Sequence, residues 1–326
     1  YPAKLVASFV GYKADTVELT KYKKKVNFKL KAEATLEEFK VTEKQASTYI
    51  NTIDPLHVET ITSKELAKAA CCNVSESFET NASVDVHVKD AVSGRKTIEM
   101  IGLDGIYTQI QAENLPMVRG LSAAYGLTFI PGTWAESIQV KKGAGSVVNG
   151  YESITGQINL EFLKPDGADK LYVNGYANAM NRRELNVHAA QNINKKWSTL
   201  SFLHVNGIQT QHDNNNDNFV DQPLREQYNF FNRWKYVGKK RMFQLGLRGV
   251  YDKIRAGQIE ANPLEPRYFI GVESKQFEVF TKNGFLFPGK PYKSIGVLNS
   301  VRYHSHDSKY GPKTFDAQQV SGYLNV

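Results

Sequence analysis

The stretch that decides the fold is Ile138–Leu160, which reads IQVKKGAGSVVNGYESITGQINL. It predicts a short strand, a glycine-rich loop and a closing strand at Gln157–Leu160. The glycines are Gly143, Gly145, Gly150 and Gly156. Glycines at this density let one backbone pass close to another and adopt positive φ. No Lys-Ser/Thr pair and no helix start follow them, which excludes a phosphate-binding loop and favours a compact domain packed inside something larger.

This stretch resembles the end of the plug domain of TonB-dependent outer-membrane receptors, where a strand, spaced glycines and a closing strand with Ile/Val-Asn recur. The matching positions are Val140, Gly143, Ser146, Gly150, Gly156, Ile158 and Asn159. Upstream, Ile101–Tyr107 resembles the family's segment before its first characteristic loop, although the usual Arg-Gly and Asp-Gly-Val-Pro elements are altered. The resemblance covers roughly residues 1–165 by motif and the remainder only by architecture.

The composition excludes a helical membrane protein but not a membrane β-barrel. Of 326 residues 41% are hydrophobic, and no run of about 18 apolar residues exists. Barrel strands alternate apolar and polar residues, so their hydropathy signal is weak. The net charge of +8 is spread along the chain. A nucleic-acid partner is not expected, because no basic stripe interleaved with stacking aromatics is present.

The cysteines are the adjacent pair Cys71 and Cys72. One adjacent pair cannot form a disulfide framework, and it lacks Cys-x-x-Cys metal spacing. Two packed thiols at a helix end, a vicinal disulfide and a soft-metal site all remain open for this pair.

Residues 1–34 contain two strand-like runs, Lys4–Val10 and Val26–Leu30. Thirty-four residues cannot bury a core of their own. They are similar to the end of the carboxypeptidase-regulatory-like β domain that precedes the plug in Bacteroidetes-type receptors.

Residues 35–54 lose the alternation and are interpreted as a linker. Within it lies a segment that resembles a TonB box: Leu36, Glu37, Glu38, Phe39, Lys40, Val41 and Thr42. The resemblance implies that TonB, energised by ExbB/ExbD, adds this segment to itself as an edge strand in the periplasm. The alternative is an ordinary linker.

Residues 55–165 are predicted to be the α+β plug. A capping box at Thr62–Glu65 predicts a helix to about Ala70, and Asn73–Glu76 predicts a second, shorter helix. Val84–Val88 and Thr97–Ile101 are strand-like. Pro116–Gly132 is poorly periodic, as expected for loops near a ligand.

Residues 166–326 carry eight strand runs, and several of them alternate well between apolar and polar residues. The runs are 169–180, 183–192, 197–210, 227–237, 241–253, 274–287, 293–304 and 314–326. In one of them, Phe243, Leu245 and Leu247 share a face opposite Gln244 and Arg248. Apolar residues on one face and charged residues on the other suit a lipid-facing wall around a polar lumen.

The connections alternate in length, which favours an outer-membrane barrel over a soluble β-sandwich. Short turns are expected at Asn192–Lys196, Gly238–Lys240 and Pro288–Lys293, and long outer loops at Gln211–Glu226, Ile254–Glu273 and Ser305–Lys313. Eight strands cannot enclose a plug, whereas plugged transporters have about 22 strands. We therefore expect this chain to be the N-terminal fragment of a larger receptor.

A calcium site is predicted in the outer loop 211–226. Side-chain oxygens of Asp213, Asn215, Asp217 and Asp221, with the carbonyl of Phe219, follow the spacing by which a loop wraps Ca²⁺. The glycine of an EF-hand is missing, and a merely solvated Asn/Asp loop is the alternative. The arrangement resembles the calcium-stabilised loops of cobalamin-type receptors.

Four residues are candidates for touching substrate. His304 and His306 share a strand face and can ligate a metal or metal chelate, although isolated surface histidines are commoner. Arg119 and Tyr125 lie in the plug stretch Pro116–Tyr125, for which the alternative is a structural loop against the barrel wall.

The resemblance implies an importer in the bacterial outer membrane that takes up a siderophore or other metal chelate, haem or a corrinoid. Its other expected partners are membrane lipid and lipopolysaccharide. No nucleophile–base pair or complete catalytic metal site can be assembled, so an enzyme is not expected. The alternatives are a plugged adhesin or protein-docking component without transport, and a soluble carbohydrate-binding β protein.

Overall fold

The computed structural model describes residues 3–7, 12–13, 15–22, 25–29, 31–32, 48–51, 58–68, 73–80, 84–145, 152–260, 267–290 and 293–326. The chain divides into two compact units, residues 1–45 and 46–326, and each is described by itself. Among the described residues, every helix is too short or too polar to cross a bilayer.

The first unit consists of short antiparallel strand pairs. Strand β1 (Ala3–Ala7) pairs with β3 (Asp15–Leu19), and β2 (Tyr12–Lys13) pairs with β4 (Lys31–Ala32). Lys4 lies opposite Glu18, and their side chains form an ion pair at 2.7 Å. The strand predicted at Val26–Leu30 is wrong, because positions 26–29 belong to no strand. Strand β3, which pairs with β1, was not predicted from the sequence.

The plug, in the second unit, is built on one six-stranded sheet. Its strands are β5 (Thr48–Asn51), β6 (Val58–Thr62), β10 (Thr108–Ala112), β11 (Leu115–Pro116), β12 (Ala135–Lys142) and β13 (Gly156–Phe162). The order is β11-β10-β13-β12-β6-β5, and β10 and β13 are parallel while the other pairs are antiparallel. The predicted strands that flank the glycine-rich loop are confirmed as the central pair β12 and β13.

Gly156 shows why that stretch needs glycine. A Cβ at this position would collide with the Lys141 carbonyl oxygen and the Met100 sulfur. The side chains around it are the plug core, where Ile138, Ile158 and Leu160 are fully buried. The signature therefore marks a close approach of backbones inside this core.

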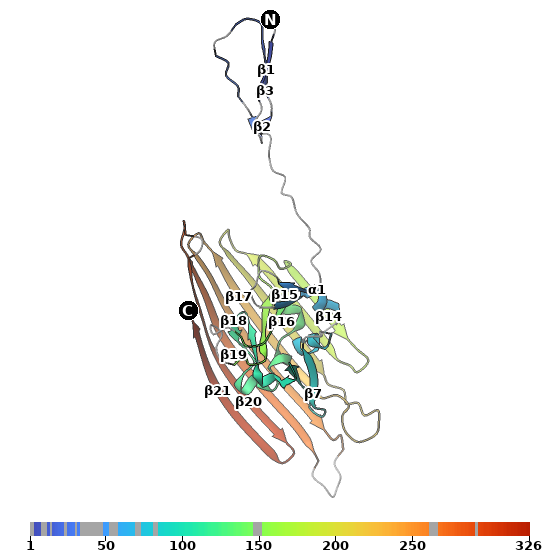
Figure 1. Cartoon of the computed structure of the whole chain (residues 1–326). Coiled ribbons are helices and arrows are strands. Elements are labelled where there is room, and N and C mark those ends of the chain that lie inside the picture. Colours follow the sequence, from blue (N-terminus) through green and yellow to red (C-terminus); the bar gives the residue numbers. More distant parts are fainter. Residues whose placement is uncertain are drawn as a thin grey trace. The chain divides into compact units, whose positions relative to one another are not determined.

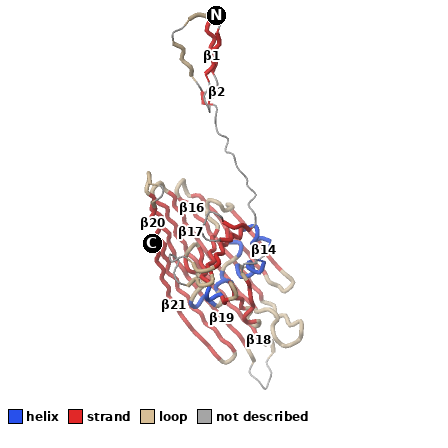
Figure 2. The backbone as a smooth tube through the Cα atoms, viewed as in Figure 1, coloured by secondary structure: helices blue, strands red, loops and turns tan. Residues whose placement is uncertain are grey.

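Short helices and a small sheet complete the plug, and Figure 2 distinguishes them by colour. The helices are α1 (Ser63–Lys68), α2 (Val74–Ser77), η1 (Phe78–Thr80), η2 (Gly105–Tyr107), η3 (Gly120–Ala123), η4 (Gly126–Phe129) and η5 (Gly132–Trp134). The sheet contains β7 (Asp85–Asp90), β8 (Arg95–Met100) and β9 (Leu103–Asp104).

Asn73 caps α2 as predicted, because its Oδ1 accepts a hydrogen bond from the backbone N–H of Ser75 at 3.1 Å.

Eight strands then form a single antiparallel wall in sequence order (Figure 1). They are β14 (Leu171–Ala177), β15 (Arg183–Asn192), β16 (Trp197–Ile208), β17 (Leu224–Val237), β18 (Arg241–Gly257), β19 (Phe269–Leu286), β20 (Ser294–Tyr310) and β21 (Lys313–Asn325). All eight predicted strands are confirmed, and several extend further than predicted.

The two faces of this wall differ as the alternation predicts. On β20, Val301 is 60% exposed and its neighbour Arg302 only 6%. On β17, Phe230 is 47% exposed and Arg233 only 1%. The apolar face points outward, and the polar face is covered by the plug.

The predicted outer loops are partly wrong in length. The long loop expected at Ser305–Lys313 is a two-residue turn, because β20 runs to Tyr310 and β21 begins at Lys313. Gly311 has φ +56, which a tight turn of this kind requires. The loop expected at 254–273 shrinks to 258–268 for the same reason. Near these strand ends the outward-facing side chains are charged. The alternation of apolar and polar residues therefore ends before the hydrogen bonding between the strands does.

Candidate functional site: the plug–barrel interface and a plug cavity

A buried carboxylate at one turn of the plug anchors it to the wall. Glu113 and Asn114 join β10 to β11 with φ of 57° and 63°. This left-handed turn directs the Glu113 side chain at the wall, where Arg233 of β17 binds both of its oxygens at 2.8 and 3.1 Å. Lys282 of β19 adds a third contact at 2.7 Å. Two-point binding of a carboxylate by arginine fixes direction as well as distance.

The charge of Glu113 is maintained by these partners. Burial by itself raises the carboxyl pKa, but the positive charges of Arg233 and Lys282 outweigh it and lower the pKa to about 2. The carboxylate is therefore ionised at neutral pH although its residue is only 1% exposed. Removing one member of such a buried group would leave unpaired charge behind.

The signature residue Asn159 positions this turn. Its Oδ1 accepts from the backbone N–H of Asn114 at 2.8 Å, and the backbone N–H of Glu113 donates to the Leu160 carbonyl at 2.7 Å. The closing strand of the glycine-rich stretch thereby holds the anchor carboxylate in place. Sequence reasoning identified Asn159 but missed Glu113, Arg233 and Lys282.

A second charged cluster lies on the inner face of the wall. Glu278 of β19 accepts a hydrogen bond from Arg302 of β20 at 2.8 Å and forms an ion pair with Arg248 of β18 at 2.6 Å. Arg302 also donates to the backbone carbonyls of Pro116 at 3.0 Å and Met117 at 2.5 Å. One wall guanidinium thus binds both a wall carboxylate and the plug backbone.

A third set of contacts holds helix η4. Gln227 and Asn229 of β17 donate to the carbonyls of Thr128 and Phe129 at 2.9 and 3.1 Å. Arg225 bridges the Thr128 hydroxyl and Asp252, each at 2.7 Å. Directional polar bonds from wall side chains to plug backbone therefore contribute to the interface alongside apolar packing.

The structure brings together three of the four predicted substrate residues, inside this interface. Tyr125 is buried, its hydroxyl lies 3.4 Å from that of Tyr310, and its ring stacks on His306 at 6.1 Å. Burial raises the pKa of Tyr125, so the phenol stays neutral. His304 is 2% exposed and packs edge-on against Phe129.

Each histidine is also bound by a wall neighbour. His304 Nδ1 lies 3.2 Å from Gln276, and His306 Nδ1 lies 2.8 Å from the Ser274 hydroxyl. A role in substrate contact stays a prediction for both.

Arg119 lies apart from that group, at a cavity in the plug. The cavity has a volume of about 310 Å³ between β8, η2 and η3. Its polar lining includes Arg95, Asp104, Arg119 and Glu152, and Arg119 Nη1 lies 3.5 Å from Glu152. Arg95 Nε is buried without a hydrogen-bond partner among the described residues. A cavity with two guanidiniums and an unpartnered donor suits an oxygen-rich, anionic ligand.

The predicted calcium loop is held together by its own hydrogen bonds. Asp213 accepts the backbone N–H groups of Asp217 and Asn218 at 3.1 and 2.9 Å. Asp217 likewise accepts the N–H of Phe219 at 2.8 Å, and Asp221 that of Asn214 at 2.9 Å.

In the described part of the chain, no three His, Cys, Asp or Glu side chains gather to hold a metal ion. Calcium binding stays a prediction.

Some predicted positions lie outside the described residues: Leu36–Thr42, Cys71, Cys72, Ser146 and Gly150. The remaining signature positions, Val140, Gly143, Gly156, Ile158 and Asn159, lie on β12 and β13 or at their ends.

Residues 54–157 match the TonB-dependent Receptor Plug Domain family. No curated protein matches the chain. Solved structures match both plug and wall. The ferric-catecholate import receptor Fiu from E. coli K12 has a TM-score of 0.59 at 11% identity, covering 83% of this chain and 44% of Fiu. The siderophore receptor PiuA from Acinetobacter baumannii has a TM-score of 0.56 at 11% identity, covering 78% and 37%.

The ferripyoverdine receptor of Pseudomonas aeruginosa, solved with ferripyoverdine bound, gives a TM-score of 0.53 at 14% identity and covers 83% of this chain. The match covers 45% of the length of the ferripyoverdine receptor. The chain therefore spans less than half the length of each of these receptors. These solved structures are receptors, and at 11–14% identity the likeness shows the fold alone. The chain therefore contains a TonB-dependent receptor plug domain and folds as that plug against eight strands of a receptor barrel, a fold of the bacterial outer membrane.

Proposed function

We propose that the protein is an energised importer of a scarce nutrient across the outer membrane. TonB, driven by ExbB/ExbD, binds Leu36–Thr42 in the periplasm and pulls on the plug. The observation that carries this proposal is the position of β5 at the edge of the plug sheet. Among the described residues it is the first strand after the TonB-box segment, and β6 is its one pairing partner there.

The register of β5 suits removal by pulling. Thr48 pairs with Ile61 and Asn51 with Val58, so a force entering before Thr48 acts first on the terminal pair. Hydrogen bonds then break one after another, each contributing only about 1 kcal/mol net. The Glu113 anchor lies at the opposite side of the sheet, on the β10–β11 turn. The near edge of the plug can thus be remodelled while the far edge stays docked.

The proposed substrate class is a ferric or other metal chelate. Support comes from the cavity lined by Arg95 and Arg119, because siderophore-type chelates present oxygen atoms and negative charge. The structural neighbours are receptors for a siderophore, a ferric catecholate and ferripyoverdine. Haem and corrinoids are the other members of the class to be tested.

Uptake of labelled chelates by cells that carry the intact receptor tests the proposal. Replacing Leu36–Thr42 by a Gly/Ser segment of equal length should abolish uptake and leave surface binding of substrate intact. The matched control is the same type of replacement at Gln209–Gln211, in an outer loop, which should leave TonB coupling intact. Uptake that persists without the TonB box would overturn the proposal, and so would binding of a protein ligand with no uptake of any chelate.

A further inference from the structure

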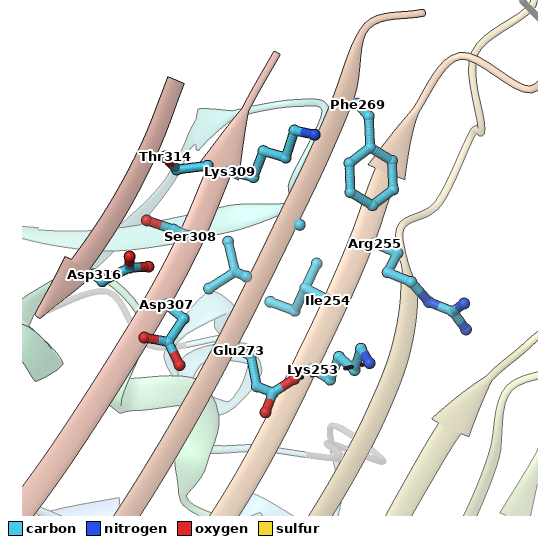
Figure 3. Close-up of a pocket in the computed structure, with 12 residues that line it drawn as sticks. Lys253, Ile254, Arg255, Phe269, Glu273, Asp307, Ser308, Lys309, Thr314 and Asp316 are labelled. Carbon is cyan, nitrogen blue, oxygen red and sulfur yellow. Dashed lines mark ion pairs between the residues drawn. The ribbon is translucent and has the colours of Figure 1, made fainter. Parts of the chain in front are cut away.

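Strands β20 and β21 present different faces at positions an odd number of residues apart. Figure 3 shows one end of these strands, where Lys309 of β20 lies beside its register partner Thr314 of β21. Five residues further along each strand, His304 pairs with Gln319. Because side chains alternate between the two faces of a sheet, the odd separation places Gln319 on the face opposite to Thr314, which is the face covered by the plug.

Gln319 contacts the plug at helix η3. Its side-chain Oε1 accepts a hydrogen bond from the backbone N–H of Leu121 at 3.0 Å. The preceding residue, Gly120, has φ +59, a left-handed conformation that favours glycine. A Cβ at Gly120 would lie 2.5–3.0 Å from three atoms of the Gln319 amide. The plug therefore needs glycine here both for the backbone conformation and for the close approach of Gln319.

The other end of the same plug segment is also bound to the wall. Arg302 of β20 donates hydrogen bonds to the backbone carbonyls of Pro116 at 3.0 Å and Met117 at 2.5 Å. Residues Pro116–Leu121, the η3 segment, are thus held by β20 at one end and by β21 at the other.

The η3 segment contributes Arg119 to the plug cavity. Val118, Arg119 and Gly120 line one side of this cavity of about 310 Å³, and Arg95 of β8 lines another. The Ser122 hydroxyl donates to the Arg119 carbonyl at 3.0 Å, which fixes the backbone from which the Arg119 side chain starts. The spacing of the two guanidiniums therefore depends on where the wall holds the η3 segment.

We propose that Gln319 is a positioning residue for the ligand of the plug cavity. Gln319 lies outside the lining of the cavity and acts through Leu121 on the placement of Arg119. The inference rests on the proposed function, because it takes the ligand to be the oxygen-rich anion proposed above.

The position of Gln319 couples the ligand to docking of the plug. Binding free energies are reciprocal, so a ligand held between Arg95 and Arg119 strengthens the contact of the η3 segment with β20 and β21. Movement of this segment away from the wall in turn weakens the hold on the ligand. Remodelling of the plug thereby releases the ligand without any change in the side chains that touch it.

Titration calorimetry of the intact receptor in detergent tests the inference, with a ferric tris-catecholate as the probe. Gln319→Leu removes the acceptor and keeps a side chain of similar size. It should weaken binding by about fivefold, the equivalent of one hydrogen bond of about 1 kcal/mol. The matched control is Gln318→Leu, because Gln318 is the neighbouring residue on the exposed face of β21. This control should bind the probe as the unsubstituted receptor does.

A double variant separates positioning from a merely structural effect. Because Gln319 acts through Arg119, Gln319→Leu should have little further effect on affinity once Arg119→Gln has removed the guanidinium. Hydrogen exchange of the Leu121 amide should also be faster in Gln319→Leu and unchanged in Gln318→Leu. Folding of every variant is checked by the heat-dependent gel mobility of the barrel.

Three results would overturn the role of Gln319: unchanged affinity in Gln319→Leu, an equal loss of affinity with and without the Arg119 guanidinium, or unchanged exchange of the Leu121 amide. Failure of the unsubstituted receptor to bind any ferric chelate is a different result. It would overturn the proposed substrate class, and the role of Gln319 in binding with it, before any substitution is made.

Discussion

At the scale of single residues, Glu113 joins the plug to the wall. Its carboxylate binds Arg233 and Lys282, and neither its position nor theirs is marked in the sequence. Glu113 and Arg233 are separated by 120 positions, and no local pattern reports a contact at that distance. Asn159 could be predicted as important because it belongs to a motif, but its role, holding the turn that carries Glu113, required the structure.

Glu113→Gln should release the plug at a lower urea concentration. The substitution leaves Arg233 and Lys282 buried without their counter-charge, a loss of about 3–5 kcal/mol. Protease cleavage of the released plug measures it. The matched control is Glu136→Gln, because the ion pair of Glu136 with Lys164 at 3.4 Å is exposed and worth about 0–1 kcal/mol. Equal effects of the two variants would contradict the anchor role.

The same contact should make plug docking pH-dependent. The folded pKa of Glu113, about 2, lies below the ordinary 4.5, so the ionised form stabilises the docked plug. That contribution, about 3 kcal/mol, is complete above pH 4.5 and is lost as the pH falls towards 2. In the unsubstituted protein, the urea concentration at the midpoint of unfolding should therefore decrease as the pH is lowered from 4.5 towards 2. Glu113→Gln should lose this part of the slope, and an unchanged slope in the variant would refute the assignment.

At the scale of elements, strand existence could be predicted and strand length could not. Several wall strands alternate clearly between apolar and polar residues, which is why the sequence predicts them. Towards the end of β20 the outward residues are charged, as at Asp307 and Lys309, and the strand pairing with β19 continues without an apolar signal. In the first unit, the run Val26–Leu30 was predicted to be a strand and positions 26–29 are not, whereas β3, which pairs with β1, was not predicted.

Gly156→Ala should destabilise the plug by about 1–3 kcal/mol, the usual cost of overpacking a core. The added methyl would meet the Lys141 carbonyl and the Met100 sulfur. Gly167→Ala is the control, because a Cβ there meets nothing within 4 Å. Thermal unfolding of the plug measures both variants, and equal melting temperatures would contradict the close approach described here.

Locking β5 to β6 should stop transport. Tyr49 and Thr60 are paired in register, so Tyr49→Cys/Thr60→Cys in a background with Cys71 and Cys72 changed to Ser can form a disulfide. Chelate uptake should cease under oxidising conditions and return with a reductant. The control Val173→Cys/Val187→Cys joins β14 to β15 in the wall and should leave uptake unchanged. Uptake unaffected by the β5–β6 disulfide would refute peeling of this edge.

At the scale of the whole molecule, residues 166–326 form a barrel wall whose polar face is covered by the plug and whose apolar face is expected to contact lipid. The fold agrees with that of receptors at only 11–14% identity. The shared feature is therefore the arrangement of apolar and polar faces, and the individual residues differ. Substrate and partner identity cannot be obtained from such a pattern, because loops and cavities vary independently of the wall.

Spin-label accessibility along β20 in the intact receptor, reconstituted in a bilayer, tests this claim most directly. Labels at Ile295, Val297, Val301 and Tyr303 should collide with oxygen dissolved in lipid, whereas labels at Ser300, Arg302 and His304 should be shielded from both oxygen and a water-soluble reagent by the plug. Alternating accessibility with a period of two residues is the predicted result. Equal access of the water-soluble reagent to both sets of positions would contradict the account.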